Sequence, residues 1–254
     1  MLKKRNIKIY NVAFDYLLNI KPQGVCLDKY FLGENRDYHS LTDVYLRFIE
    51  SAQNYQAMPN IIAFEKRKKD IASILFDFDV YKIAEIPEDK LYSYFRKKFN
   101  VTAPDNRNNS WLKWTRAVID SAKFLSGFAD EKDFDTFVKR FDYNVSTRMA
   151  LPLLIQAKIR GIGFALACDA LKELGYTNYP KPDKHLIDVF AGVGLCANTP
   201  ISVYEAVAQM ADDSNETPYK VDKVFWLICS GNYYHDGIKE NSHKQELITL
   251  LKQI

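Results

Sequence analysis

The stretch IRGIGFALACDALKELGYTNYPKPDKHLIDVF, residues 159–190, has two closely spaced glycines at one end and a Pro-Asp step near the other. Apolar and small residues recur at helical spacing before and after the glycines, which predicts two helices joined by a short turn. Gly161 can take a left-handed conformation at no side-chain cost, and Ile162 is expected to fill the core between the helices. Gly163 leaves the first N–H groups of the second helix uncovered. Such a helix start can bind phosphate, although a tight connection without a ligand explains the same residues.

Helical spacing of apolar residues recurs along most of the chain and predicts a mainly or wholly α (all-α) fold. SLTDVYLRFIESAQNY (40–55) begins with a Ser/Thr cap, and NIIAFEKRKKDIASILFDF (60–78) carries apolar residues opposite a basic run. APDNRNNS (103–110) is predicted to be a loop, and IKIYNV (7–12) is a short β-like segment. Further helices are expected at 87–99, 110–126, 131–141, 145–158, 164–175, 184–191, 201–211, 219–229 and 243–253.

Composition excludes several classes of protein. The 254 residues are 26% charged with a net charge of only +3, which is typical of a globular protein and does not by itself indicate a nucleic-acid binder. Cys26, Cys168, Cys196 and Cys229 lie far apart without a C-x-x-C pair, so free thiols are favoured over a zinc site or an iron–sulfur cluster. No apolar run approaches the roughly 20 residues of a membrane span. The start lacks the apolar core of a signal peptide, so a cytoplasmic protein (cytosol or nucleoid) is expected.

Several conspicuous residues have a purely structural explanation. Asp183 follows Pro182 and directly precedes an apolar-periodic segment, so it is expected to cap a helix and contribute about 1 kcal/mol. Trp111 and Trp114, three residues apart, are expected in the core. The basic runs 66–69 and 96–98 are interpreted as solvated helix faces, with DNA contact as the alternative.

Three short segments, taken together and in order, resemble the helix-hairpin-helix DNA glycosylase superfamily, which includes endonuclease III, the adenine glycosylase and the 8-oxoguanine glycosylases. Members have the pattern L-P-G-[VI]-G, a helix, and then [VP]-x-D-x-H-[VIL]. This chain has I-R-G-I-G (159–163), a helix, and then K-P-D-K-H-L (181–186). Upstream, ESAQNYQ (50–56) is similar to the L-S-[AS]-Q-x-[TN]-x segment of the family. The resemblance spans about half of the chain.

The resemblance implies two helical subdomains with a cleft between them. Residues 41–180 would form a helical barrel with a wedge loop and the hairpin, and residues 1–40 plus 181–254 would form a second subdomain that carries Asp183. Gln53, with Asn54 beside it, would enter the duplex in place of an extruded base. The hairpin would hold the DNA backbone without reading its sequence, and its main-chain carbonyls would hold a monovalent cation, K⁺ or Na⁺. The implied DNA-binding residues are Gln53, Asn54, Arg160, Gly161, Ile162, Gly163, Lys184 and His185, and the implied carbonyls are those of Ala157, Ile159 and Ile162.

The implied reaction removes a damaged, mismatched or modified base from double-stranded DNA. Cleavage of the C1′–N bond passes through an oxocarbenium-like transition state, whose charge the catalytic carboxylate of Asp183 would stabilise, or Asp183 would activate the attacking water. The base must first leave the stack, at a cost on the order of a few kcal/mol, which a wedge and a backbone grip make possible. A monomer without an iron–sulfur cluster, acting on DNA and not on a membrane, is expected.

The chain departs from the family pattern at the hairpin. Members that cleave the strand carry a Schiff-base lysine two residues after the second glycine, where this chain has Ala165, so a monofunctional enzyme that uses water is inferred. A bifunctional glycosylase with a displaced lysine (Lys158, Lys181 or Lys184) and a non-catalytic binder of damaged or bent DNA are the alternatives. Arg160 replaces the usual Pro and would add a phosphate contact. Base-stacking residues are expected near the last helices, where core packing is the alternative for Trp226: Phe225, Trp226, Tyr233 and Tyr234.

Overall fold

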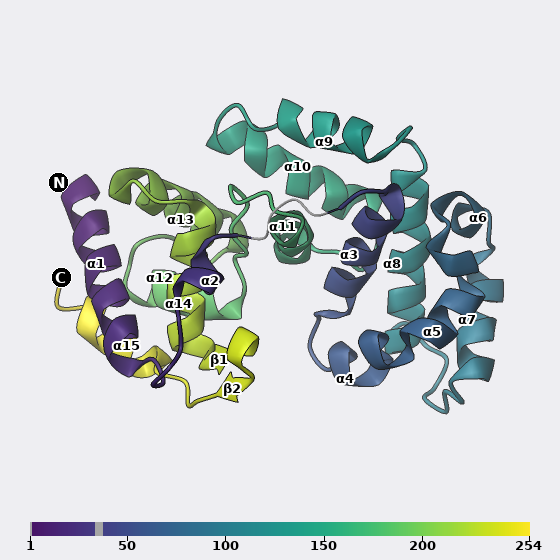
Figure 1. Cartoon of the computed structure of the whole chain (residues 1–254), viewed down its shortest axis with the longest axis horizontal. Coiled ribbons are helices and arrows are strands. Elements are labelled where there is room, and N and C mark those ends of the chain that lie inside the picture. The colour runs from purple at the N-terminus through teal and green to yellow at the C-terminus, as the bar shows by residue number, and fades with distance from the viewer. Residues whose placement is uncertain (1, 34–37) are drawn as a thin grey trace. The chain divides into compact units, whose positions relative to one another are not determined.

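The computed structural model describes residues 2–33 and 38–254, and Figure 1 shows that helices make up most of the described chain. The predicted mainly α fold is confirmed. The elements are α1 (Leu2–Ile20), α2 (Asp28–Phe31), α3 (Leu41–Gln53), α4 (Met58–Ile62), α5 (Phe64–Ile74), the 3₁₀ turn η1 (Phe76–Phe78), α6 (Val80–Ala84), α7 (Glu88–Lys98), α8 (Ser110–Leu125), α9 (Glu131–Arg140), α10 (Val145–Lys158), α11 (Phe164–Glu173), α12 (Lys184–Gly192), α13 (Pro200–Ser214), α14 (Pro218–Ser230), β1 (Asn232–Tyr233), η2 (Tyr234–Asp236), β2 (Ile238–Lys239) and α15 (Lys244–Leu251).

Contacts divide the chain into two compact units. Unit 1 comprises Met1–Arg36 and Leu171–Ile254, and unit 2 comprises Asp37–Ala170. The predicted boundaries at 40/41 and 180/181 differ from these. Residues 171–180 belong to unit 1, where Lys172 forms an ion pair with Asp222 and the Tyr219 N–H donates to the Thr177 carbonyl. Residues 38–40 belong to unit 2, where Ser40 caps α3. Residue 1 and residues 34–37 of the predicted terminal subdomain lie outside the described residues.

The core of unit 2 is built around α8, which packs against α3, α4, α6 and α7. Trp111 and Trp114 lie on the buried face of α8 with 3% and 0% of their surface exposed, so their predicted place in the core is confirmed. The Trp114 indole N–H donates to the Ile49 carbonyl at 2.9 Å, which satisfies its buried donor. Its ring lies 6.0 Å from that of Phe64 and 5.4 Å from that of Phe95, measured between centroids.

The core of unit 1 is built around α14, which packs against α1, α2, α12, α13 and α15. β1 and β2 pair antiparallel and follow α14 as a short hairpin. The β-like interpretation of IKIYNV is wrong, because these residues lie within α1. Two of them, Ile9 and Tyr10, form one buried stripe at helical spacing with Ala13 and Leu17, and α1 packs against α13 and α14.

The helix predicted over 60–78 is interrupted twice. Ala63 has φ +48° and separates α4 from α5. In one continuous helix Ile62 and Phe64, two residues apart, would point to different faces, whereas the break lets both be fully buried. The second interruption is η1, where Phe76, Asp77 and Phe78 all have positive φ, a conformation that costs an L-residue roughly 1–2 kcal/mol.

Candidate functional site

The predicted hairpin is present in unit 2, with the short turn 159–163 between α10 and α11. Ile159 and Ile162 are buried, and the Ile162 N–H donates to the Ile159 carbonyl at 3.2 Å. Ile162 therefore fills the core, as predicted. Gly161 and Gly163 are both accessible to solvent.

The two glycines have different roles in the turn. Gly161 has φ +87°, and a Cβ atom there would lie 3.1 Å from the Lys113 carbonyl oxygen and 3.3 Å from the Ala117 Cβ, both on α8. This position needs glycine for its conformation and for the close approach of the chain to α8. Gly163 has no positive φ, and a Cβ there would meet nothing within 4 Å. The start of α11 is therefore open on the side of Gly163, which leaves room for an anion near its first N–H groups.

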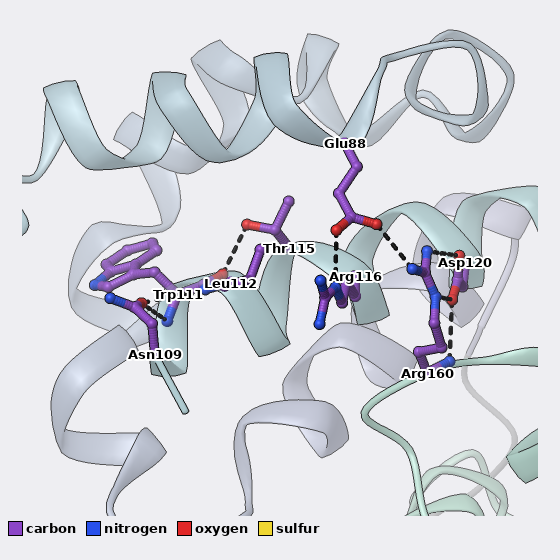
Figure 2. Close-up of polar contacts among 8 residues, drawn as sticks. All are labelled: Glu88, Asn109, Trp111, Leu112, Thr115, Arg116, Asp120 and Arg160. Carbon is purple, nitrogen blue, oxygen red and sulfur yellow. Dashed lines mark hydrogen bonds and ion pairs between the residues drawn. The ribbon is translucent and has the colours of Figure 1, made fainter. Parts of the chain in front are cut away.

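Arg160 ties the turn to α7 and α8 through carboxylates (Figure 2). Its Nε and Nη2 atoms donate to the two oxygens of Asp120 at 2.7 and 2.9 Å, and its Nη1 atom donates to Glu88 at 2.8 Å. Its backbone N–H also donates to Asp120, at 3.0 Å. Glu88 accepts a further bond at 2.8 Å from Arg116. We call Glu88, Arg116, Asp120 and Arg160 the latch.

The latch perturbs the acids that it contains. Burial raises the pKa of Asp120, but the side-chain and backbone hydrogen bonds from Arg160 outweigh it, and the pKa lies below its ordinary value. The pKa of Glu88 is lowered in the same way, since the bonds from Arg116 and Arg160 overcome partial burial. The predicted phosphate contact of Arg160 would have to compete with these ion pairs, although 55% of the side chain is exposed.

The three carbonyls assigned to a monovalent cation lie in or next to the turn. Ala157 is in the last turn of α10, whose final carbonyls have no partner within the helix. The Ile159 carbonyl accepts one hydrogen bond and retains a second lone pair. Neutral oxygens of this kind suit K⁺ or Na⁺. Over residues 2–33 and 38–254 there is no group of three or more His, Cys, Asp or Glu side chains that could hold a metal ion.

The two wedge candidates, Gln53 and Asn54, stand at the end of α3. The Gln53 Oε1 atom accepts the Phe64 N–H at 3.2 Å, so this half-buried side chain caps the start of α5. The exposed Asn54 donates through Nδ2 to Asp169 at 3.3 Å, and Asp169 is a buried residue of α11. Unit 2 therefore brings the wedge segment and the second helix of the hairpin together through Asn54.

Asp183 is the N-cap of α12, as predicted. Its Oδ1 atom accepts the N–H groups of His185 and Leu186 at 2.8 and 3.3 Å, and its own N–H donates to the Lys181 carbonyl at 2.8 Å. The side chain is half-buried. Lys184 is exposed and forms an ion pair with Asp188 at 2.5 Å, so it remains at the surface beside Asp183.

His185 is half-buried, and its Nδ1 atom has no hydrogen-bond partner in the described part of the chain. Burial lowers the pKa of His185, while the charge of Asp183 opposes the shift. The imidazole is therefore held toward its neutral form, which weakens it as a phosphate contact.

The four predicted base-stacking residues separate into two groups. Phe225 and Tyr233 are buried in the core of unit 1, so their predicted stacking role is wrong. Trp226 is half-buried and Tyr234 is exposed, and their ring centroids lie 6.0 Å apart in an edge-to-face arrangement. Base stacking by these two rings stays a prediction.

Two buried lysines of unit 1, Lys172 and Lys223, were not predicted from the sequence, and their side chains are 4% and 6% exposed. The Lys172 ammonium lies 3.1 Å from the buried carboxylate of Asp222. The Lys223 ammonium donates to the Tyr234 hydroxyl at 2.9 Å and lies 4.9 Å from the centroid of that ring. The sequence signal that could have indicated their burial is the position of both lysines among apolar residues, in DALKEL (169–174) and VDKVFWL (221–227).

Comparison of the chain with protein-family models, with curated proteins and with solved structures found no match. Among the described residues, no helix has both the length and the apolar character needed to cross a membrane. Any function proposed for the chain therefore depends on its own residues and their contacts.

Proposed function

We propose that this protein is a DNA N-glycosylase that removes an abnormal base by hydrolysis. The observation that carries the proposal is the glycine turn of unit 2, in which a close-packed Gly161 precedes the open start of α11 at Gly163. A turn of this kind suits a DNA phosphate, because main-chain N–H groups can approach the oxygen atoms without a side chain between them. The order of the wedge segment, this turn and Asp183 along the chain supports the same proposal.

Asp183 is the proposed catalytic carboxylate. One of its oxygens is used by the two N–H groups of the α12 cap, which fixes the side chain. In the proposed reaction a water oxygen forms a bond to C1′, the C1′–N bond breaks, and the base leaves with the bonding electron pair. Asp183 takes the proton of the water, or stabilises the positive charge on the sugar. Ala165 offers no amine, so the proposed product is an abasic site in an intact strand.

Two structural contacts of the predicted site residues favour a second candidate, a protein that binds damaged or bent DNA without catalysing a reaction. Asp183 already has a structural role as a helix cap, and the Gln53 carbonyl is engaged by the Phe64 N–H. In this case the glycine turn would hold the backbone and no base would be released. The two candidates differ in one measurable product, the abasic site.

A panel of duplexes, each with one damaged, mismatched or modified base, tests the proposal. Incubation followed by hot alkali converts every abasic site into a strand break. We expect breaks with at least one lesion for the wild-type protein and none for Asp183→Asn, because Asn caps a helix as well as Asp but carries no charge. DNA affinity should be unchanged in this variant. Asp188→Asn, on the same helix, is the matched control and should retain excision.

Binding without breaks on every duplex would support the second candidate, and excision by Asp183→Asn would remove the catalytic role of Asp183. In either case the affinity should fall with salt, with a slope of about −0.9 for each neutralised phosphate.

A further inference from the structure

The carboxylate of Asp222, on α14, is completely buried in unit 1. Its Oδ2 atom accepts the backbone N–H of Lys181 at 2.7 Å and lies 3.1 Å from the Lys172 ammonium. Its Oδ1 atom has no hydrogen-bond partner within residues 2–33 and 38–254. A buried carboxylate is costly unless it is paired, so its position calls for an explanation.

Asp222 holds the segment that leads to Asp183. In Pro180-Lys181-Pro182-Asp183 the two prolines have no N–H, so the backbone has only two donors. The Lys181 N–H donates to Asp222, and the Asp183 N–H donates to the Lys181 carbonyl. Of these two donors, the Lys181 N–H is the one that reaches another element, α14, and its acceptor is Asp222.

The chain of contacts continues into α12. Asp183 accepts the N–H groups of His185 and Leu186, so a series of hydrogen bonds joins α14 to the first turn of α12. Lys172 adds the end of α11 to the same series through its ion pair with Asp222. We propose that Asp222 is the positioning residue of Asp183, and that Lys172 balances its buried charge. This inference rests on the catalytic role proposed for Asp183.

The electrostatics agree with this geometry. Burial raises the pKa of Asp222, while the charges of Lys172 and Lys223 and the Lys181 N–H oppose the shift. The negative charge of Asp183 contributes to raising it, which places the two carboxylates within electrostatic reach of each other. Removing Lys172 alone would leave Asp222 with less compensation in a buried place.

Two double variants test the inference without leaving a buried charge alone. Lys172→Met with Asp222→Asn keeps an oxygen that can accept the Lys181 N–H, and Lys172→Met with Asp222→Leu removes it. Both lose the same charges, so they differ in the acceptor. Two measurements on the full chain are compared: the hydrogen-exchange rates of the Lys181 and Asp183 amides by NMR, and kcat and KM for excision on the best lesion duplex.

In the Leu double variant we expect both amides to exchange about tenfold faster or more than in the Asn double variant. We expect kcat to fall by a similar factor with KM within about twofold, because an interaction that only orients the carboxylate acts on the chemical step. The Asn double variant should remain close to wild type in both measurements. The circular dichroism of the two variants should agree, which separates positioning from a general loss of structure.

Equal amide exchange in the two double variants would show that Asp222 does not hold the segment and would overturn the inference. Faster exchange with equal kcat would overturn it as well, because the segment would then be held without any effect on catalysis. Failure of the proposed function has a different signature, namely no excision by the wild-type protein or full excision by Asp183→Asn. The exchange comparison does not depend on excision and still decides whether Asp222 anchors residues 181–183.

Discussion

Replacing each hairpin glycine by alanine should separate Gly161, whose conformation the turn requires, from Gly163, which is proposed to leave room for a phosphate. At Gly161 an alanine must adopt φ +87°, which costs roughly 1–2 kcal/mol. Its Cβ would also lie 3.1 Å from the Lys113 carbonyl, and relieving such overpacking costs about 1–3 kcal/mol. We expect Gly161→Ala to lower the free energy of unfolding of unit 2 by about 2–5 kcal/mol. Gly163→Ala meets no atom and should change it by about 0.5 kcal/mol or less.

The three tryptophans provide the assay. Trp111 and Trp114 lie in unit 2 and Trp226 lies in unit 1, so a Trp226→Phe background leaves fluorescence that reports on unit 2 alone. Urea unfolding should then show a midpoint about 1–2.5 M lower for Gly161→Ala, with a slope of about 2 kcal/mol per M. Gly163→Ala should retain the midpoint and bind DNA about tenfold more weakly, because its methyl group enters the space proposed for a phosphate.

Equal midpoints for the two variants would contradict the structural role of Gly161. A Gly163→Ala protein that is as stable as wild type and binds DNA equally well would remove the anion role of the turn.

Two further predictions concern stability in unit 2. The latch acids Glu88 and Asp120 have lowered pKa values in the folded chain, so they contribute stability at neutral pH that is lost as the pH falls below their ordinary values of 4.5 and 3.8. Between pH 6 and 3 the urea midpoint should therefore fall more for the wild-type protein than for the double variant Glu88→Gln with Asp120→Asn. Parallel curves of midpoint against pH would refute a stabilising role of the latch. Asn144 and Thr147 form a capping box at the start of α10, so Asn144→Ala should lower the free energy of unfolding by about 1 kcal/mol, measured with urea, while Asn144→Ser should remain close to wild type. An equal loss of stability in both variants would contradict the capping role of Asn144.

Most helices after residue 110 could be predicted, because their boundaries are set by nearby residues. The α8 helix begins after Asn109, α9 after Asp130 and α12 after Asp183, and each of these side chains accepts backbone N–H groups of the helix that follows. Such caps act within three residues of the chain, and the apolar spacing continues behind them. The hairpin could be predicted for the same reason, since its two glycines and Ile162 are adjacent in the sequence.

The errors of the sequence analysis arise from contacts between distant residues. The apolar residues of IKIYNV satisfy a strand pattern over a short window, and only packing of α1 against α13 and α14 decides for a helix. The break at Ala63 allows both Ile62 and Phe64, two residues apart, to be buried, which helical periodicity does not encode. In the candidate site, the partners of Arg160 on α7 and α8 and the burial of Lys172 and Lys223 depend on tertiary packing. A phosphate contact was predicted for Arg160 because the carboxylates of Glu88 and Asp120 lie far from it in the sequence.

Unit 1 is assembled from the two ends of the chain, whereas unit 2 is one continuous segment between them. During synthesis α1 leaves the ribosome before unit 2, but its apolar stripe packs against α13 and α14, which are made after unit 2. At about 5–20 residues per second, translation from Ile20 to Pro200 takes roughly 10–40 s. All of unit 2 emerges in this interval and can fold while α1 still lacks its partners. A nascent chain of this protein therefore carries an uncovered amphipathic helix ahead of unit 2 until α13 and α14 emerge.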